Sequence, residues 1–103
     1  MATVRRVSAR ELQRIFNTQG YYRRAQNGNL EEKVVSSRHP SKPKAREPFC
    51  TKSQMVAYYN KSGKKVALVH QYLRKDGAIG ASGLPDPKFL LLGEVRYQLI
   101  TLT

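Results

Sequence analysis

Strand-forming segments follow one another from residue 53 to residue 99, and turn signals separate them. The segments "SQMVAYYN", "KKVALVHQYLR", "KFLLL" and "VRYQLITLT" are rich in the β-branched and aromatic residues that favour strands. Between them stand "NKSG", Asp76-Gly77 and Gly93-Glu94, which are typical of turns. Residues 53–103 are therefore predicted to form an antiparallel β-meander of about four strands.

A helix is predicted over residues 8–19. Ser8 and Glu11 have the spacing of a capping box, in which each side chain bonds a free backbone N–H at the helix start. Leu12, Ile15 and Phe16 form an i, i+3, i+4 apolar stripe, and Gly20 provides a stop. We expect an α+β fold in which this N-terminal helix packs on one face of the sheet.

Residues 21–52 are predicted to be a basic, proline-containing connection. The segment "RHPSKPKAREP" contains three prolines and has the composition of an extended loop. Only Lys33 to Ser36 suggest a short strand within the connection. At 103 residues the chain is expected to form a single domain, 1–103.

The run "KFLLL" is apolar on both faces of its predicted strand. One short helix covers only one face of a sheet. Either the polar N-terminal segment packs over the second face, or another subunit does. A homodimer formed through this face is therefore one expectation, and the chain is then an interaction module of unknown ligand.

Positive charge is the strongest overall property of the sequence, with 19 Lys and Arg against 7 Asp and Glu, a net charge of +12 and a pI near 10.3. Such a charge attracts polyanions, because each phosphate contact releases condensed counterions. Nucleic acid or another polyanion is the expected partner, and the leading prediction is a small binding or accessory protein without catalysis. The candidate binding residues are Arg10, Arg14, Arg23, Arg24, Lys42, Lys44, Arg46, Arg74 and Lys88.

Tyrosines interleaved with Lys and Arg on the predicted strands suggest a surface that stacks unpaired bases. The alternative is that these rings fill core and cross-strand positions. Tyr58 and Tyr59 point to opposite faces of their strand, so at most one of them belongs to such a surface.

His70 and Tyr72 share a strand face, and Arg74 continues the same alternation. With Lys88 they supply the residue types of a metal-free ribonuclease, which needs a base, an acid and cations around the reacting phosphate. The alternative function is thus a compact, toxin-like ribonuclease that uses His70 and Arg74. The structural alternative is a half-buried histidine that is hydrogen-bonded within the sheet.

The long loop before "KFLLL" is either a binding loop or a wide connection stiffened by prolines. Its glycines permit a close backbone approach to an anion, although they match no known phosphate-loop motif. The loop residues that we consider candidates for the site are Gly80, Ser82, Gly83 and Asp86.

Several classes of site are not expected. No His, Cys and acidic residues stand at metal-ligand spacing, and the single Cys50 excludes a disulfide framework. We expect no metal and no cofactor. The longest apolar run is too short to cross a bilayer and no secretory signal is visible, so the expected location is the cytoplasm.

Overall fold

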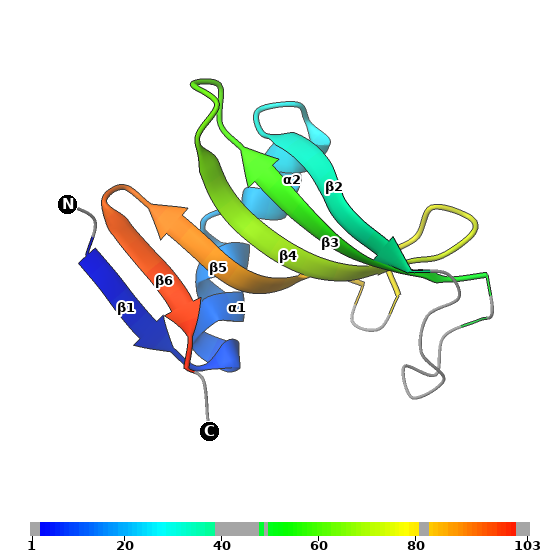
Figure 1. Ribbon diagram of the computed structural model, residues 1–103, viewed down its shortest axis with the longest axis horizontal. Coiled ribbons are helices and arrows are strands. Elements are labelled where there is room, and N and C mark those ends of the chain that lie inside the picture. Colours follow the sequence, from blue (N-terminus) through cyan, green and yellow to red (C-terminus); the bar gives the residue numbers. More distant parts are fainter. Residues whose placement is uncertain (1–2, 39–47, 49, 81–82, 101–103) are drawn as a thin grey trace.

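The protein folds into one six-stranded sheet with two helices among the described residues, in the strand order β1-β6-β5-β4-β3-β2 (Figure 1). The structure is a computed structural model that describes residues 3–38, 48, 50–80 and 83–100. The α+β class with an antiparallel-dominated sheet is confirmed. The expected sheet of about four strands was too small.

Five strands form the predicted meander and its extension. They are β2 (Glu31–Arg38), β3 (Lys52–Tyr59), β4 (Lys65–Leu73), β5 (Asp86–Leu92) and β6 (Val95–Leu99). Each pairs with the next in an antiparallel ladder. The strand suggested at Lys33 to Ser36 is longer than expected, and it adds a fifth member to the meander.

The sixth strand, β1 (Thr3–Val7), lies parallel to β6, with Thr3 opposite Val95 and Val7 opposite Leu99. This strand was not predicted from the sequence. Its residues "TVRRV" lack a clear apolar face, because the adjacent Arg5 and Arg6 interrupt the alternation. A parallel partner at the other end of the chain leaves no local turn signal to detect.

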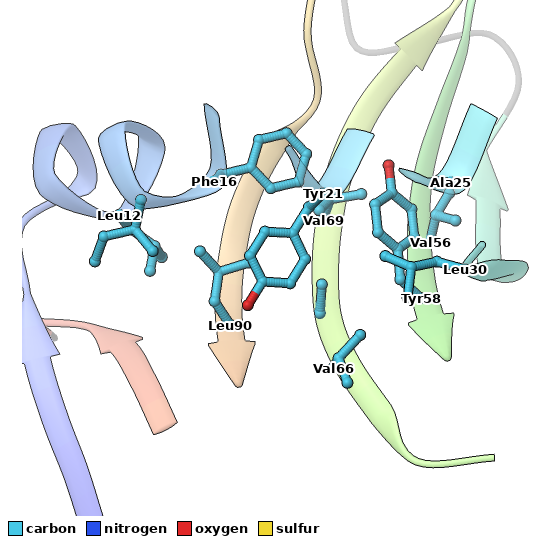
Figure 2. Close-up of a cluster of buried hydrophobic side chains, with 12 residues drawn as sticks. Leu12, Phe16, Tyr21, Ala25, Leu30, Val56, Tyr58, Val66, Val69 and Leu90 are labelled. Carbon is cyan, nitrogen blue, oxygen red and sulfur yellow. The ribbon is translucent and has the colours of Figure 1, made fainter. Parts of the chain in front are cut away.

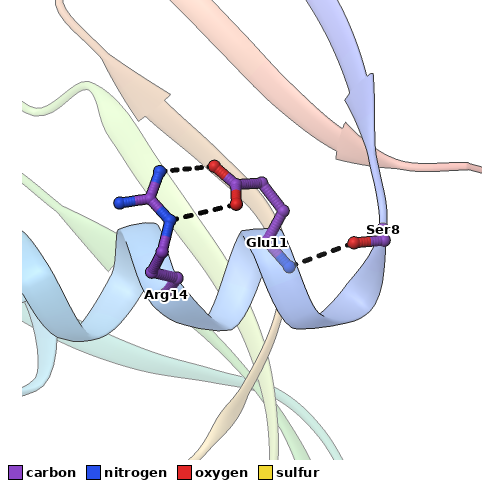
Figure 3. A network of polar contacts seen from close by, with 3 residues as sticks. All are labelled: Ser8, Glu11 and Arg14. Atoms are coloured by element: carbon purple, nitrogen blue, oxygen red, sulfur yellow. Dashed lines mark hydrogen bonds and ion pairs between the residues drawn. The ribbon is translucent and has the colours of Figure 1, made fainter.

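Helix α1 (Ala9–Thr18) confirms the predicted helix. The Ser8 hydroxyl accepts a hydrogen bond from the Glu11 backbone N–H at 3.1 Å, as an N-cap does. The Glu11 carboxylate does not complete the capping box. It accepts two hydrogen bonds from the Arg14 guanidinium instead (Figure 3).

A second helix, α2 (Tyr21–Gln26), lies inside the segment that was expected to be a connection. Gly20, with φ 67°, adopts the left-handed conformation that lets the chain leave α1 and begin α2 at once. Only Tyr21 and Ala25 are buried in α2. The polar segment "YYRRAQ" therefore did not predict a helix, because the buried face of this helix is narrow.

Both helices cover the same face of the sheet, and the core lies between the helices and this face (Figures 1 and 2). Leu12, Phe16 and Tyr21 reach down from the helices to Val69 and Leu90 on the central strands. The Phe16 ring stacks on Tyr21 with 5.9 Å between centroids, and it lies 6.3 Å from the Tyr58 ring. Three aromatic rings therefore join the two helices to β3.

Two buried tyrosines in this core differ in how their hydroxyls are satisfied. The Tyr21 hydroxyl donates to the Leu91 carbonyl at 2.7 Å. The Tyr58 hydroxyl is buried and has no hydrogen-bond partner among the described residues. Burial raises the Tyr58 pKa, since the phenolate form is penalised in the core, and the nearby Glu32 adds to this effect.

This difference predicts opposite effects when each tyrosine is replaced by phenylalanine. Tyr21→Phe removes a hydrogen bond and should lower the free energy of unfolding by about 0.5–1.5 kcal/mol. Tyr58→Phe removes a desolvated group without a partner, so stability should stay the same or rise by about 1 kcal/mol. Urea denaturation of the two variants measures both changes. A larger loss for Tyr58→Phe than for Tyr21→Phe would show that the Tyr58 hydroxyl has a partner.

The "KFLLL" run is largely covered by its own chain. Leu90 is fully buried under the helices, and Phe89 on the opposite face is only 6% exposed. Leu91 and Leu92 are half-buried. This burial removes the reason for which a dimer through that run was predicted, and the oligomeric state itself stays a prediction.

Candidate functional site

The sheet has one face that no described helix covers (Figure 1). We call it the open face. Cross-strand partners share a face, so the pairing registers define its members. The paired residues of this face are Val4 and Arg6 on β1, Glu31, Lys33, Ser36 and Arg38 on β2, Ser53, Met55, Ala57 and Tyr59 on β3, Lys65, Leu68, His70 and Tyr72 on β4, Asp86, Phe89 and Leu91 on β5, and Arg96 and Gln98 on β6. We include Lys88 of β5 as well, because its charge acts on His70.

Cations lie over aromatic rings in the middle of the open face. The Arg96 guanidinium carbon is 4.2 Å from the centroid of the Phe89 ring, and Lys65 Nζ is 5.8 Å from the same ring. On the neighbouring strands, Lys33 Nζ lies 5.0 Å from the centroid of Tyr59. Such contacts hold a cation in place while its charge still faces outward.

Arg96 is held mainly by this stacking. Its Nε is buried and has no hydrogen-bond partner in the part of the chain that the structure describes. The guanidinium lies over the Phe89 ring, which helps to explain the low exposure of a ring on the open face. A guanidinium plane is itself a surface on which a base can stack.

A second group of side chains surrounds His70. Its Nε2 and the Ser53 hydroxyl are 2.8 Å apart in a hydrogen bond, and its ring meets Tyr72 edge-on with 4.7 Å between centroids. Asp86 stands directly opposite His70 in the β4–β5 register. Lys88 lies in the bulge that follows on β5 and is exposed.

The pKa of His70 is lowered from its usual value of 6.5. Partial burial is the main cause, the positive charge of Lys88 adds to it, and the carboxylate of Asp86 opposes it. These surroundings therefore favour the neutral imidazole over the charged form. The neutral form is satisfied by the bond to Ser53, as the structural reading of His70 expected, and it is also able to accept a proton.

The structure brings some predicted site residues together and separates others. His70, Tyr72, Asp86 and Lys88 form one group on the open face. Arg74 lies beyond the end of β4 and lines a different hollow of about 500 Å³ with Pro48, Cys50, Lys75 and Asp76. His70 does not line that hollow. The predicted combination of His70 with Arg74 in one site is therefore not favoured by the geometry.

The long loop is tied closely to its own chain. Its first part turns back on β4, where Gly80 N–H donates to the Tyr72 carbonyl at 2.7 Å and Ile79 bridges to Leu73. Its last part passes beside α1, where Gln13 donates to the carbonyl of the buried Pro85. Gly83 is exposed, and Ser82 lies outside the described residues. These contacts are those of a structural connection.

The predicted binding residues on the helices lie on the side opposite the open face. Arg10 and Arg23 are exposed there, Arg14 is paired with Glu11, and Arg24 lies 5.4 Å from the centroid of Tyr21. Lys42, Lys44 and Arg46 lie outside the described residues. The sequence pointed to Arg6 as a cation for polyanion binding, but not to the other open-face cations Lys33, Arg38, Lys65 and Arg96.

A polar hollow of about 290 Å³ lies on the helix side, beyond α2. Gln71 donates to Gln54 at 3.0 Å across its floor, and Glu32 stands at its rim with a pKa raised by burial. The two glutamine side chains are hydrogen-bonded to each other, so we interpret this hollow as the polar end of the core.

No family model, curated protein or solved structure matches this chain. Within the described ranges, no group of three or more His, Cys, Asp or Glu residues is placed to hold a metal ion. The helices of the described chain are all too short or too polar to cross a bilayer. The function must therefore be argued from the open face itself.

Proposed function

We propose that the protein binds single-stranded nucleic acid on the open face of its sheet. The observation that supports this proposal best is the set of cations held over aromatic rings, Lys33 over Tyr59 and both Lys65 and Arg96 over Phe89. Unpaired bases stack on aromatic rings and guanidinium planes, while the phosphates between them contact lysines and arginines.

The charge of the open face agrees with this partner. Arg6, Arg38 and Lys88 add to the three stacked cations, against two acids on the face, Glu31 and Asp86. Tyr72 is half-buried beside His70 and presents a further ring. Aromatic and basic groups are thus spread over β2 to β6. A flexible single strand of nucleic acid is able to contact such groups one after another as it crosses the sheet.

Binding should depend steeply on salt. If about four phosphates are contacted, the logarithm of the association constant should fall with the logarithm of salt concentration at a slope of about −3. Fluorescence anisotropy with labelled single-stranded RNA and DNA of mixed sequence measures this slope, and duplexes of the same length are the comparison. Equal affinity for duplex and single strand would point to a general polyanion binder. No binding at low salt would contradict the proposal.

RNA cleavage is the second candidate activity, and the group around His70 is what favours it. A neutral His70 is able to take the proton of a 2′-hydroxyl that attacks phosphorus, with Lys88 beside the phosphate. The new O2′–P bond replaces the P–O5′ bond, and the departing 5′-oxygen takes a proton from water. The same RNA samples, run on a gel after the titration, reveal any cleavage. Cleavage that is lost in His70→Ala while binding is kept would assign the activity to this group. Intact RNA leaves binding as the function.

A further inference from the structure

The sheet ends in two edge strands, β1 and β2, which lie at its opposite ends (Figure 1). An edge strand presents unpaired N–H and C=O groups and is a ready template for another strand. All eight residues of β2 are exposed. At its middle, Val34 is 56% exposed and Val35 is 63% exposed, although both are apolar.

The two edges differ in how well each would pair with a copy of itself. Antiparallel self-pairing of β1 would place Arg5 opposite Arg5, or opposite Arg6 in the next register, so like charges protect this edge. Strand β2, "EEKVVSSR", has acids at its start and a base at its end, and it contains no proline. Its charges therefore suit an antiparallel copy of itself.

The complementarity of β2 extends over its whole length. When two copies pair about a two-fold axis between Val34 and Val35, those valines face each other at the centre. Glu31 of each copy then faces Arg38 of the other, so one opposite-charge pair stands at each end. The intervening partners are Lys33 with Ser36 and Glu32 with Ser37, which bring no like charges together.

A β-bulge makes this register geometrically consistent. In a regular strand, Glu31 and Arg38 would point to opposite faces, because the side-chain period is two. The β2–β3 register shifts between Val34 and Ser36, so Glu31 pairs with Tyr59 and Arg38 pairs with Ser53, both on the open face. A bulge hinders pairing with a regular strand, but in a symmetric pair both copies carry it at the axis.

We propose that β2 binds β2 of a second copy of this chain, antiparallel and edge to edge, and joins the two sheets into one. A two-fold axis perpendicular to the sheet places both open faces on the same side. The proposal does not depend on nucleic-acid binding, although a dimer of this form would offer one continuous basic surface across both copies.

Charge reversal at the two ends of β2 tests this pairing by analytical ultracentrifugation without nucleic acid. The variant Glu31→Arg has basic residues at both positions 31 and 38, and the variant Arg38→Glu has acidic residues at both. Each single variant should weaken dimerisation about tenfold or more, because two attractive pairs become repulsive. An equimolar mixture of the two variants should dimerise again, and the double variant Glu31→Arg/Arg38→Glu should dimerise like the original chain.

Controls with the same change of charge lie in exposed turns, as Glu94→Arg and Lys61→Glu. These should dimerise like the original chain. The rescue in the mixture also excludes misfolding as the cause of a loss, since two misfolded chains would not restore each other. An original chain that stays monomeric at about 1 mM overturns the proposal. A dimer that is unchanged by both charge reversals also overturns the proposal. If that dimer is lost in Leu91→Lys, the contact lies at the "KFLLL" run instead.

Discussion

Replacing Phe16 by alanine should lower the free energy of unfolding by about 3–5 kcal/mol, the usual loss for a buried aromatic residue. Phe16 is fully buried, and its ring packs near both Tyr21 on α2 and Tyr58 on β3. The loss is large because the cavity would open where both helices meet the sheet. The total free energy of unfolding of a small domain is only about 5–15 kcal/mol. The melting temperature should therefore fall by about 15 °C or more.

Urea denaturation and thermal melting followed by circular dichroism measure this change. Asn17→Ala is the matched control, because Asn17 is the next residue on α1 and is exposed, with a side-chain bond only to Gln13. Its effect should stay within about 0.5 kcal/mol. A Phe16→Ala variant that is as stable as this control would contradict the packing of α1 on the sheet.

Replacing Lys33, Lys65 and Lys88 together by glutamine should weaken binding to single-stranded nucleic acid by about 10–100-fold at low salt. All three lysines are exposed on the open face, and Lys33 and Lys65 lie over aromatic rings there. If each contacts one phosphate, the salt slope should become shallower by about 2. The amide keeps most of the side-chain length, so the loss reports charge.

The control removes the same charge from other surfaces. The residues Arg10 and Arg23 on the helices and Lys61 in the β3–β4 turn are also exposed, and their triple replacement by glutamine leaves the open face unchanged. We expect this variant to lose only a few-fold in affinity through the lower overall charge. An equal loss in both triple variants would mean that net charge alone drives binding. A larger loss in the control would move the interface to the helix side.

Local signals explain which elements the sequence predicted. The meander strands β3 to β6 follow one another through short turns or a loop. Their buried side chains point to the one face that packs against the core. Helix α1 has its cap, its apolar stripe and its stop in one short stretch. The strand β1 and the helix α2 lack such signals, because β1 depends on a partner that is distant in sequence and α2 buries only two side chains.

The candidate site was predictable only in part, for the same reason. The alternation on β4 correctly placed His70 and Tyr72 on one face, away from Val69 and Gln71. The juxtaposition of Arg96 with Phe89, and of Lys33 with Tyr59, requires the register between different strands. That register includes bulges on β2, β4 and β5, which no residue pattern in the sequence revealed.

The parallel pairing of β1 with β6 has a consequence for the order in which this chain acquires its structure during synthesis. Thr3 is made long before its partner Val95, because nearly all the other elements lie between them in the sequence. Helix α1 likewise packs against β5, so Leu12 and Phe16 lack this part of their packing until Leu90 has been translated. Contacts between such distant residues slow folding, because a long loop must close before they form. The apolar side of α1 therefore waits for β5 during synthesis, and β1 enters the sheet only after β6 has been made.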